Sequence, residues 1–355
     1  MCKRIFANQT SEQGDVPFFK IGTIGGTPDA YITRDLFEEY KAKYNYPHEG
    51  EVMITCAGTV GKTIVFDGED AYFQDSNIVW LSNPKQLYIN SFLNYVLSRV
   101  NWNILNSTTI TRIYNDNLRE LVINYPSIKE QEKIVALLSL LDRRIAIQNK
   151  VIEDLKKLKT ALEERMLGQC QGKQVRLRDI LIERVEKSRI NNQYEVLSST
   201  VSGIYSQREY FNKEIASADN TGYKAIHRGD VVLSPQNLWM GNINYNDRFE
   251  IGIVSPSYKV FSIDEKFDKG YIAFLLKTRK ALWAYSLVSE QGASIVRRNL
   301  NYESFLEISF VIPSLKEQQA TARRLSAFKQ KQTMEEAFLR SLLLQKEFML
   351  KSLFI

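Results

Sequence analysis

The sequence predicts a mixed α/β (α+β) protein built as a tandem repeat, with two globular regions that are each followed by a long helix. Three observations support this fold class. The segment Pro-Ser-Ile-Lys-Glu-Gln at residues 126–131 returns as Pro-Ser-Leu-Lys-Glu-Gln at 313–318, an offset of 187 residues. A heptad pattern of apolar residues follows each copy. The composition, with 44% hydrophobic and 25% charged residues, is that of a globular protein.

A second pair of matching segments supports the duplication. His-Glu-Gly-Glu-Val at 48–52 corresponds to His-Arg-Gly-Asp-Val at 227–231. A weaker third match joins 109–112 with 294–297. The matches keep their order, which predicts four parts: a first globular domain at 1–125, a first spacer helix at 126–170, a second globular domain at 171–312 and a second spacer helix at 313–355.

Each long helix has a start signal and a heptad seam. Ser127 with Glu130, and Ser314 with Glu317, have the spacing of a capping box. Apolar residues then recur at alternating steps of four and three, which is typical of a coiled coil. The seam residues are Ile134, Leu138, Leu141, Ile145, Ile152, Leu155, Leu162 and Met166 in the first helix, and chiefly Leu325, Phe328, Leu339, Leu342, Met349 and Leu353 in the second.

We expect the two seams to pack against each other. Helices of about 39 residues are roughly 58 Å long and need a partner for their apolar face. Antiparallel pairing buries both seams at once. Gln148 and Lys159 interrupt the first seam, and Glu335 and Lys346 interrupt the second at the same repeat positions. Such pairing brings Gln148 near the late positions of the second seam, so we expect Lys346 to meet a polar partner.

Short strands and helices are expected in each globular domain. The second domain also opens with a strand-like stretch at 174–180. The first domain has no counterpart of this stretch, because Met1 falls near position 179 of the repeat. The patterns predict strands at 52–56, 63–66, 78–81 and 121–125 with a helix at 88–100 in the first domain, and strands at 231–234, 251–254, 257–262 and 307–312 with a helix at 271–282 in the second.

The motifs that suggest catalysis are incomplete. Gly-Lys-Thr at 61–63 ends like a phosphate-binding loop, but Cys56 stands where that loop needs a glycine. Asp29 with the acid-Tyr-Lys run at 39–41 imitates a metal-dependent nuclease. A helix is predicted at 34–44, however, and residues i and i+2 of a helix diverge. Both the nucleotide-hydrolase and the nuclease interpretation are therefore disfavoured.

Histidines and cysteines give no site either. His48 and His227 are the two histidines of the chain, too few for a zinc site, and their place before Gly-acid-Val favours a turn. Cys2, Cys56 and Cys170 are odd in number and far apart, which disfavours a disulfide framework and favours a reducing, cytoplasmic setting. No stretch approaches the roughly 18–20 apolar residues of a membrane span, so no membrane is expected as a partner.

The plan of two α/β domains, each followed by Pro-Ser-[Ile/Leu]-Lys-Glu-Gln and a heptad helix, resembles the specificity subunit of type I restriction–modification systems. The resemblance covers nearly the whole chain. Residues 50–54 running into Gly-Thr-Val-Gly-Lys at 58–62 are similar to a strand and loop common in the recognition domains of that family. In the second domain 229–233 keeps the strand, but 237–241 departs from the loop, as expected for domains that recognise different sequences.

The resemblance implies a DNA-binding subunit without catalytic activity, metal or cofactor of its own. Each target-recognition domain would bind one half of an asymmetric, interrupted site in double-stranded DNA. The helices would set the spacer and dock two methyltransferase subunits, with restriction/translocase subunits in the full complex. S-adenosylmethionine, ATP and Mg are expected on these partner subunits only. Exposed charges proposed for docking are Arg143, Arg144, Lys156 and Lys157.

Candidate DNA contacts lie on loops of both domains, where side chains that donate hydrogen bonds can reach phosphates and base edges. The candidates are Thr59, Lys62, Gln74, Asn77 and Arg112 in the first domain and Gln236, Asn237, Asn242, Arg297 and Arg298 in the second. The net charge of +6 permits a nucleic-acid partner, but 1–125 carries −3, so we expect the lone chain to bind DNA poorly by charge alone. Two other interpretations stay open: a coiled-coil scaffold without DNA specificity, and the recognition part of a fused restriction–methylation enzyme.

Overall fold

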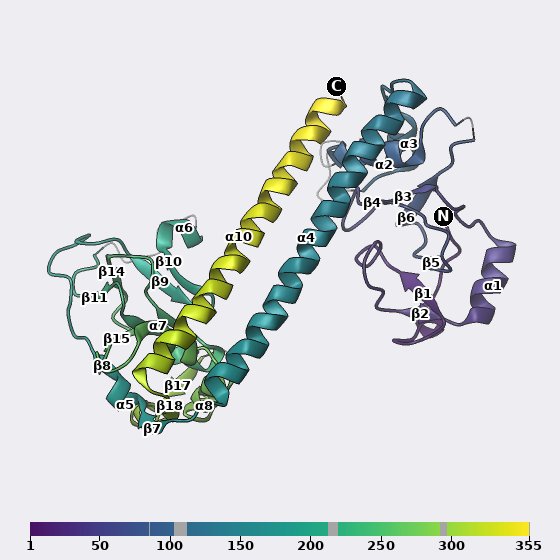
Figure 1. Cartoon of the computed structure of the whole chain (residues 1–355). Coiled ribbons are helices and arrows are strands. Elements are labelled where there is room, and N and C mark those ends of the chain that lie inside the picture. Colours follow the sequence, from purple (N-terminus) through teal and green to yellow (C-terminus); the bar gives the residue numbers. More distant parts are fainter. Residues whose placement is uncertain (85, 103–111, 212–218, 292–296, 355) are drawn as a thin grey trace. The chain divides into compact units, whose positions relative to one another are not determined.

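The computed structural model describes residues 1–84, 86–102, 112–211, 219–291 and 297–354, and it forms two compact units (Figure 1). Unit 1 contains Met1–Asn149 and Phe338–Ile355, and unit 2 contains Lys150–Ala337. Two long helices are observed, α4 at Ile128–Gly168 and α10 at Leu315–Leu353, so each contributes one part to each unit. The predicted mixed α/β fold class, with a long helix after each globular region, is confirmed.

The globular part of unit 1 contains two small sheets, with strand orders β2-β1-β5 and β4-β3-β6. The predicted strands at 52–56, 63–66 and 78–81 and the predicted helix at 88–100 are observed as β3, β4, β6 and α2. The elements are η1 (Ala7–Gln9), β1 (Val16–Phe19), β2 (Tyr31–Ile32), α1 (Arg34–Lys43), β3 (Val52–Thr55), β4 (Thr63–Val65), β5 (Tyr72–Phe73), β6 (Ile78–Leu81), α2 (Asn90–Arg99) and α3 (Asn115–Arg119).

One predicted strand of the first domain, at 121–125, is not observed. Among the described residues this segment pairs with no strand. Its repeat counterpart is β18 (Ser309–Ile312), which pairs antiparallel with β7 (Lys173–Arg176) in unit 2. A strand exists through its pairing, and unit 1 has no described strand in the place of β7. The prediction from residue pattern alone was wrong here for that reason.

The globular part of unit 2 is built around a four-stranded sheet with the order β13-β12-β15-β8. The predicted strands are observed as β12, β14, β15 and β18. The elements are β7, α5 (Leu177–Ile180), β8 (Leu181–Glu183), β9 (Leu197–Thr200), β10 (Gly203–Ser206), α6 (Gln207–Phe211), β11 (Lys224–His227), β12 (Val231–Leu233), η3 (Pro235–Met240), β13 (Ile243–Tyr245), β14 (Ile251–Val254), β15 (Lys259–Ile263), α7 (Lys269–Leu275), α8 (Arg279–Leu287), β16 (Ser289–Gln291), β17 (Arg298–Leu300), α9 (Tyr302–Glu307) and β18.

The helix predicted at 271–282 is two helices, α7 and α8. The hydroxyl of Thr278 accepts a hydrogen bond from the backbone N–H of Ala281 (3.2 Å) and thereby caps the start of α8. A threonine at this position offers the backbone a cap in place of a continuous helix. The prediction of a single helix was therefore wrong, although both pieces are helical.

The two long helices contact each other along their seams within each unit. In unit 1, Asp142 of α4 forms an ion pair with Lys346 of α10 (2.5 Å), and Arg144 lies over the ring of Phe338 at 5.9 Å. Residue numbers rise along α4 as they fall along α10, so the helices are antiparallel there. Lys346 thus meets the polar partner that the seam pattern predicts.

The long helices of unit 1 also complete the core of its globular part. Phe92 and Tyr95 of α2 pack in one buried cluster with Ile134 and Leu138 of α4. Phe354, which follows α10, joins that cluster through a ring contact with Phe92 at 5.2 Å. The domain and the adjoining helix segments therefore form one hydrophobic core rather than separate bodies.

A buried glutamine joins each long helix to its domain. Gln131, the last residue of the repeated segment, accepts a hydrogen bond from the backbone N–H of Ile89, at the start of α2 (2.8 Å), and donates to the Pro126 carbonyl (2.9 Å). Gln318 makes the same pair of bonds in the second copy, from Asp268 N–H at the start of α7 (2.9 Å) and to the Pro313 carbonyl (2.9 Å). The duplicated segment thus builds the same joint twice.

Candidate nucleic-acid interface

The loop that follows β3 is held from both sides. The buried hydroxyl of Thr55 donates to the Thr59 carbonyl and accepts from the backbone N–H of Lys62 (3.0 Å). Gly61 has a φ of +83°, and a Cβ at this position would lie 2.2 Å from the indole of Trp102. Only glycine fits this combination of backbone angle and close approach. The loop therefore presents the exposed side chains of Thr59 and Lys62 from a fixed backbone.

The other candidates of the first domain surround this loop. The Lys62 ammonium donates to the Ile24 carbonyl, and the Gln74 amide accepts from the N–H of Ile21 (3.2 Å). Arg112 donates to the Ser76 carbonyl (3.3 Å), next to Asn77. The structure thus gathers the five predicted residues on adjoining loops, although the rest of the third repeat match, 109–111 and 294–296, lies outside the described residues.

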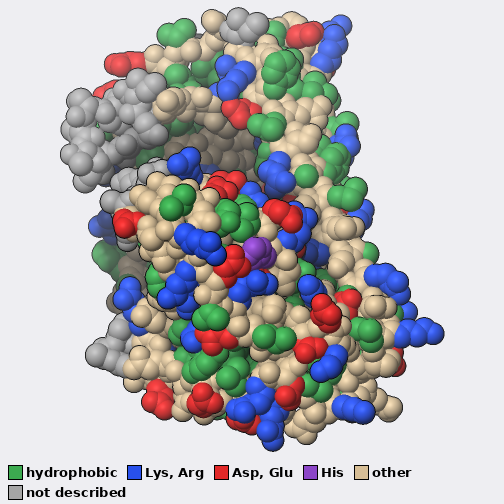
Figure 2. Space-filling model, turned by 90° about the vertical axis from the view of Figure 1, so that its left-hand side faces the viewer, with side chains coloured by type: hydrophobic (Ala, Val, Ile, Leu, Met, Phe, Trp, Pro, Cys, Tyr) green, Lys and Arg blue, Asp and Glu red, His purple; other side chains and the backbone are tan. Residues whose placement is uncertain are grey.

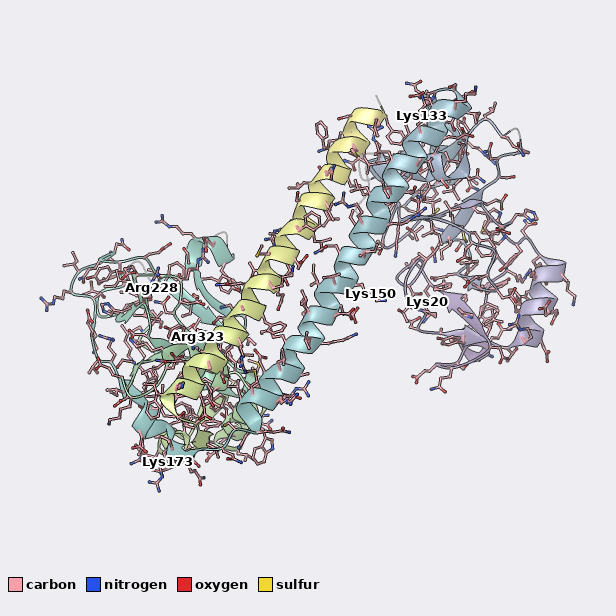
Figure 3. All side chains as sticks on the ribbon, viewed as in Figure 1. Lys20, Lys133, Lys150, Lys173, Arg228 and Arg323 are labelled. Carbon is pink, nitrogen blue, oxygen red and sulfur yellow. The ribbon has the colours of Figure 1, made fainter. Side chains whose placement is uncertain are left out.

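A loop that the sequence analysis missed lies between them. Residues 20–26 contact both Lys62 and Gln74 through backbone groups. Lys20, labelled in Figure 3, begins the segment and forms an ion pair with Asp29 (3.1 Å). Its Gly-Thr-Ile-Gly-Gly sequence at 22–26 is a loop signal that could have placed it among the candidates.

In the second domain the equivalent position, after β12, holds the short helix η3. Gln236 on η3 is exposed and Asn237 is half-buried. Arg298 of β17 lies with its guanidinium 4.2 Å from the ring centre of Trp239, and its buried Nε has no hydrogen-bond partner. Arg297 precedes it and is exposed. Four of the five predicted residues are thus on or beside η3 with surface to offer.

Asn242 has a different environment from the other candidates. Its side chain is only 4% exposed. The amide donates to the Ser199 carbonyl (2.9 Å) and its oxygen accepts from the Ser199 hydroxyl (2.7 Å). Asn244 donates to the same hydroxyl (2.7 Å). The role of Asn242 as a base contact stays a prediction, and it would require this network to open.

Lys277, between α7 and α8, is a second residue that the sequence analysis missed. Its ammonium donates to the carbonyls of Gly241 (2.8 Å) and Val201 (3.1 Å), and burial lowers the pKa of Lys277 to about 8. It therefore ties the end of the η3 loop to the domain. A single charged residue within Leu-Leu-Lys-Thr is the signal that the sequence offers.

The two loops are braced in the same way although their sequences differ. Gly241 ends the η3 loop with a φ of +90°, and a Cβ there would lie 2.8 Å from Leu282 of α8. Gly61 and Trp102 precede Gly241 and Leu282 by the same 180 residues. Both domains thus position a loop by packing a glycine under the side chain that follows or ends the equivalent helix, while the side chains that the loops expose are different.

Charge on the surface is mixed. Figure 2 shows Lys and Arg side chains interleaved with Asp and Glu side chains over the face in view. Among the described residues there is no group of three or more His, Cys, Asp or Glu side chains placed to hold a metal ion. Of the helices in the described ranges, none combines the length and apolar character that crossing a membrane requires.

The outward faces of the long helices carry apolar side chains besides the predicted charges. Arg144 covers Phe338, Lys156 pairs with Glu336 (3.8 Å) and Lys157 pairs with Glu153 (2.5 Å), while Arg143 is exposed. The sequence analysis missed exposed apolar residues at heptad-like spacing. They are Leu137, Leu140 and Ile147 of α4 with Leu343, Leu344 and Phe348 of α10 in unit 1, and Leu158 of α4 with Met334 of α10 in unit 2.

Comparison with known proteins follows the repeat. A family model described as the type I restriction modification DNA specificity domain matches residues 1–157 and again 173–342. A Haemophilus influenzae protein named as a type I restriction enzyme specificity subunit is 50% identical over 155 residues. That match covers 44% of this chain and 40% of the relative, so it spans less than half of either.

Solved structures share the fold. The S subunit of a type I restriction–modification system from M. genitalium superposes with a TM-score of 0.58 at 18% identity, over 100% of this chain and 92% of that one. A chain from a structure on complex assembly and conformational transition of a type I R-M system gives a TM-score of 0.55 at 12% identity, over 95% and 90% of the two chains. At these identities the similarity establishes the fold.

Proposed function

Since the chain belongs to the type I restriction–modification DNA specificity family, which matches both copies of its repeat, we propose that it is the DNA-recognition subunit of such a complex. Each globular domain recognises one half of an asymmetric, interrupted site in double-stranded DNA. One observation carries the proposal: the two domains hold a loop at the same repeat position by the same glycine packing, Gly61 under Trp102 and Gly241 under Leu282, but expose different side chains.

Recognition is assigned to the loop residues that have exposed or half-exposed side chains. Lys62 and Arg112 supply positive charge in the first domain, and Arg297 and Arg298 supply it in the second. Arginine forks onto guanine edges and lysine binds phosphate, so these types suit both classes of contact. The family match favours this role over a scaffold without DNA specificity or a fused enzyme.

The exposed apolar faces of α4 and α10 are the proposed docking surface for two methyltransferase subunits. Leu140, Ile147 and Phe348 are exposed on helices whose seams are already filled. Exposed apolar stripes beside charged residues favour burial by a partner helix. The chain has no catalytic role in this proposal. The partner subunits hold S-adenosylmethionine, ATP and Mg, and restriction/translocase subunits join the full complex.

The direct test is to co-express the chain with a cognate methyltransferase subunit and to map methylated adenines by long-read sequencing. Exchange of residues 174–312 for the corresponding domain of another family member should change one half-site only. A change in both half-sites, or in neither, would show that the domains are not separate recognition modules. An exchange of 126–170 for the same helix of that relative is the matched control and should leave both half-sites as they are.

Affinity gives a second test. Because 1–125 carries a net charge of −3, the lone chain should bind its site weakly, and the methyltransferase subunits should raise affinity by enclosing the duplex. Gel-shift titrations at fixed salt compare the two states. Equal specific affinity with and without the partner subunits would contradict this part of the proposal.

A further inference from the structure

The two copies of the repeat differ at one place in their packing. In unit 2, β18 is covered on one side by β7, with Ser309 paired to Arg176 and Ile312 paired to Lys173. Figure 1 shows β7, α5 and β18 together in unit 2, and Lys173, at the start of β7, is labelled in Figure 3. The same repeat position in unit 1 is 122–125, whose backbone has no recorded hydrogen bond within the described chain.

Side-chain exposure confirms that this edge is uncovered in unit 1. Val122 is 87% exposed and Tyr125 is 45% exposed, whereas Ile312, the counterpart of Tyr125, is 4% exposed. Leu118 and Ile123 are only partly buried, although their counterparts in unit 2 are fully buried phenylalanines. A hollow of about 260 Å³ lies beside the edge and is lined by Val96, Arg99, Val100, Leu121, Val122, Ile123, Asn124 and Phe354.

The charges that hold the covering segment in unit 2 are also kept in unit 1. Glu307 of α9 forms ion pairs with Arg176 (3.3 Å) and Arg178, and Glu303 pairs with Arg178 (3.8 Å). The counterparts of these acids, 187 residues earlier, are Glu120 and Asp116. Both are exposed, and in the described chain Glu120 has no recorded ion pair.

We infer that this edge of unit 1, formed by α3 and 121–125, is a docking site for a segment of a separate polypeptide. The segment adds a strand to 122–125, continues as one helical turn, and carries two arginines that flank a leucine, as in 173–180. Main-chain pairing gives such a site its affinity, and the acids and the hollow select the side chains. The site is independent of the proposed DNA recognition.

A second copy of this chain is a poor source of that segment. Leu177, Ile180 and Leu181 of 173–183 are almost fully buried in the core of unit 2, and β7 and β8 are both paired. Donating the segment to a neighbour would open that core and lose its apolar burial. The unused edge therefore fits a different polypeptide with the same pattern.

Fluorescence polarisation of a labelled peptide with the sequence of residues 173–183 against the full chain tests the inference. We expect saturable binding that Glu120→Arg weakens roughly fivefold, as expected when one partly exposed charge pair is lost. A peptide carrying Arg178→Glu should recover affinity for that variant. Glu132→Arg, an exposed acid on α4 of the same unit, is the matched control and should change nothing.

Hydrogen exchange locates the peptide. Protection of amides 122–125 without change at 309–312 supports the inference. Protection at 309–312 instead, or the absence of saturable binding, overturns it. Light scattering of the chain alone should give a monomer, and a dimer that the peptide dissociates would assign the edge to a second copy and overturn the proposed source. Circular dichroism of Glu120→Arg verifies that the variant is folded.

Discussion

Replacing Gln131 by methionine tests the joint between the first domain and its long helix. The side chain is fully buried and bonded to three backbone groups: the N–H of Ile89 (2.8 Å) and the carbonyls of Pro126 (2.9 Å) and Leu87 (3.3 Å). Methionine fills a similar volume, so the cost comes from the polar groups and not from a cavity. Leaving buried backbone groups without a partner costs about 1–3 kcal/mol each, and the 3.3 Å bond is the weakest. We expect unit 1 to lose roughly 3–5 kcal/mol.

Guanidinium titration followed by tryptophan emission measures that loss for each unit. Trp80 and Trp102 lie in unit 1, while Trp239 and Trp283 lie in unit 2, so a background in which the latter two are phenylalanine reports unit 1 alone. The joint in unit 2 has two of these bonds, and Gln318→Met should cost roughly 2–4 kcal/mol there.

The exposed Gln345 of α10 provides the matched control, since Gln345→Met removes no buried bond and should change stability by less than about 0.5 kcal/mol. A Gln131→Met variant within that same range would refute the assignment of the joint. Faster hydrogen exchange at the first amides of α2, with α1 unchanged, would locate the effect at the contact described above.

Three further perturbations address the loops and the helices. Gly61→Ala should destabilise unit 1 by more than about 1 kcal/mol in a thermal melt, because φ is +83° and the new Cβ meets Trp102; an unchanged melting temperature would contradict the bracing. Burial lowers the pKa of Lys277 from 10.5 to about 8, so the unfolded chain binds more protons between these values, and the wild type should gain stability relative to Lys277→Met as pH rises from 8 to 10.5; parallel pH profiles of the two proteins would contradict this. Insertion of four residues between 154 and 158 adds about 6 Å of helix and should lengthen the spacer of the methylated site by a base pair or so with both half-sites kept, whereas an unchanged spacer in an active mutant would show that the helices are not a ruler.

The sequence was most informative where residue patterns repeat. The offset of 187 residues located both long helices, and the seam interruption at Lys346 indicated a polar contact, which is Asp142. These features depend on local periodicity and on the comparison of two copies, both of which a single chain contains. The functions of the loop residues remain predictions, although the structure gathers most of them around two equivalent loops.

Features that depend on a distant partner were missed. Gln131 and Gln318 follow Lys-Glu and look like solvated helix residues, yet each is buried against the start of another helix. The strand pattern at 121–125 has no partner strand, and no local pattern states whether one is present. The stacking of Arg298 on Trp239 likewise joins residues nearly sixty positions apart.

The sharing of both long helices between the units has a consequence for synthesis on the ribosome. Unit 2 is one continuous stretch, Lys150–Ala337, so all of its contacts are available once that stretch has emerged. Unit 1 needs Phe338–Ile355, and its α2–α4 cluster stays open until Phe354 reaches Phe92. The half that is translated first is therefore completed last. Until then its apolar seam at Ile134 and Leu138 depends on chaperones or on a partner subunit for cover during translation.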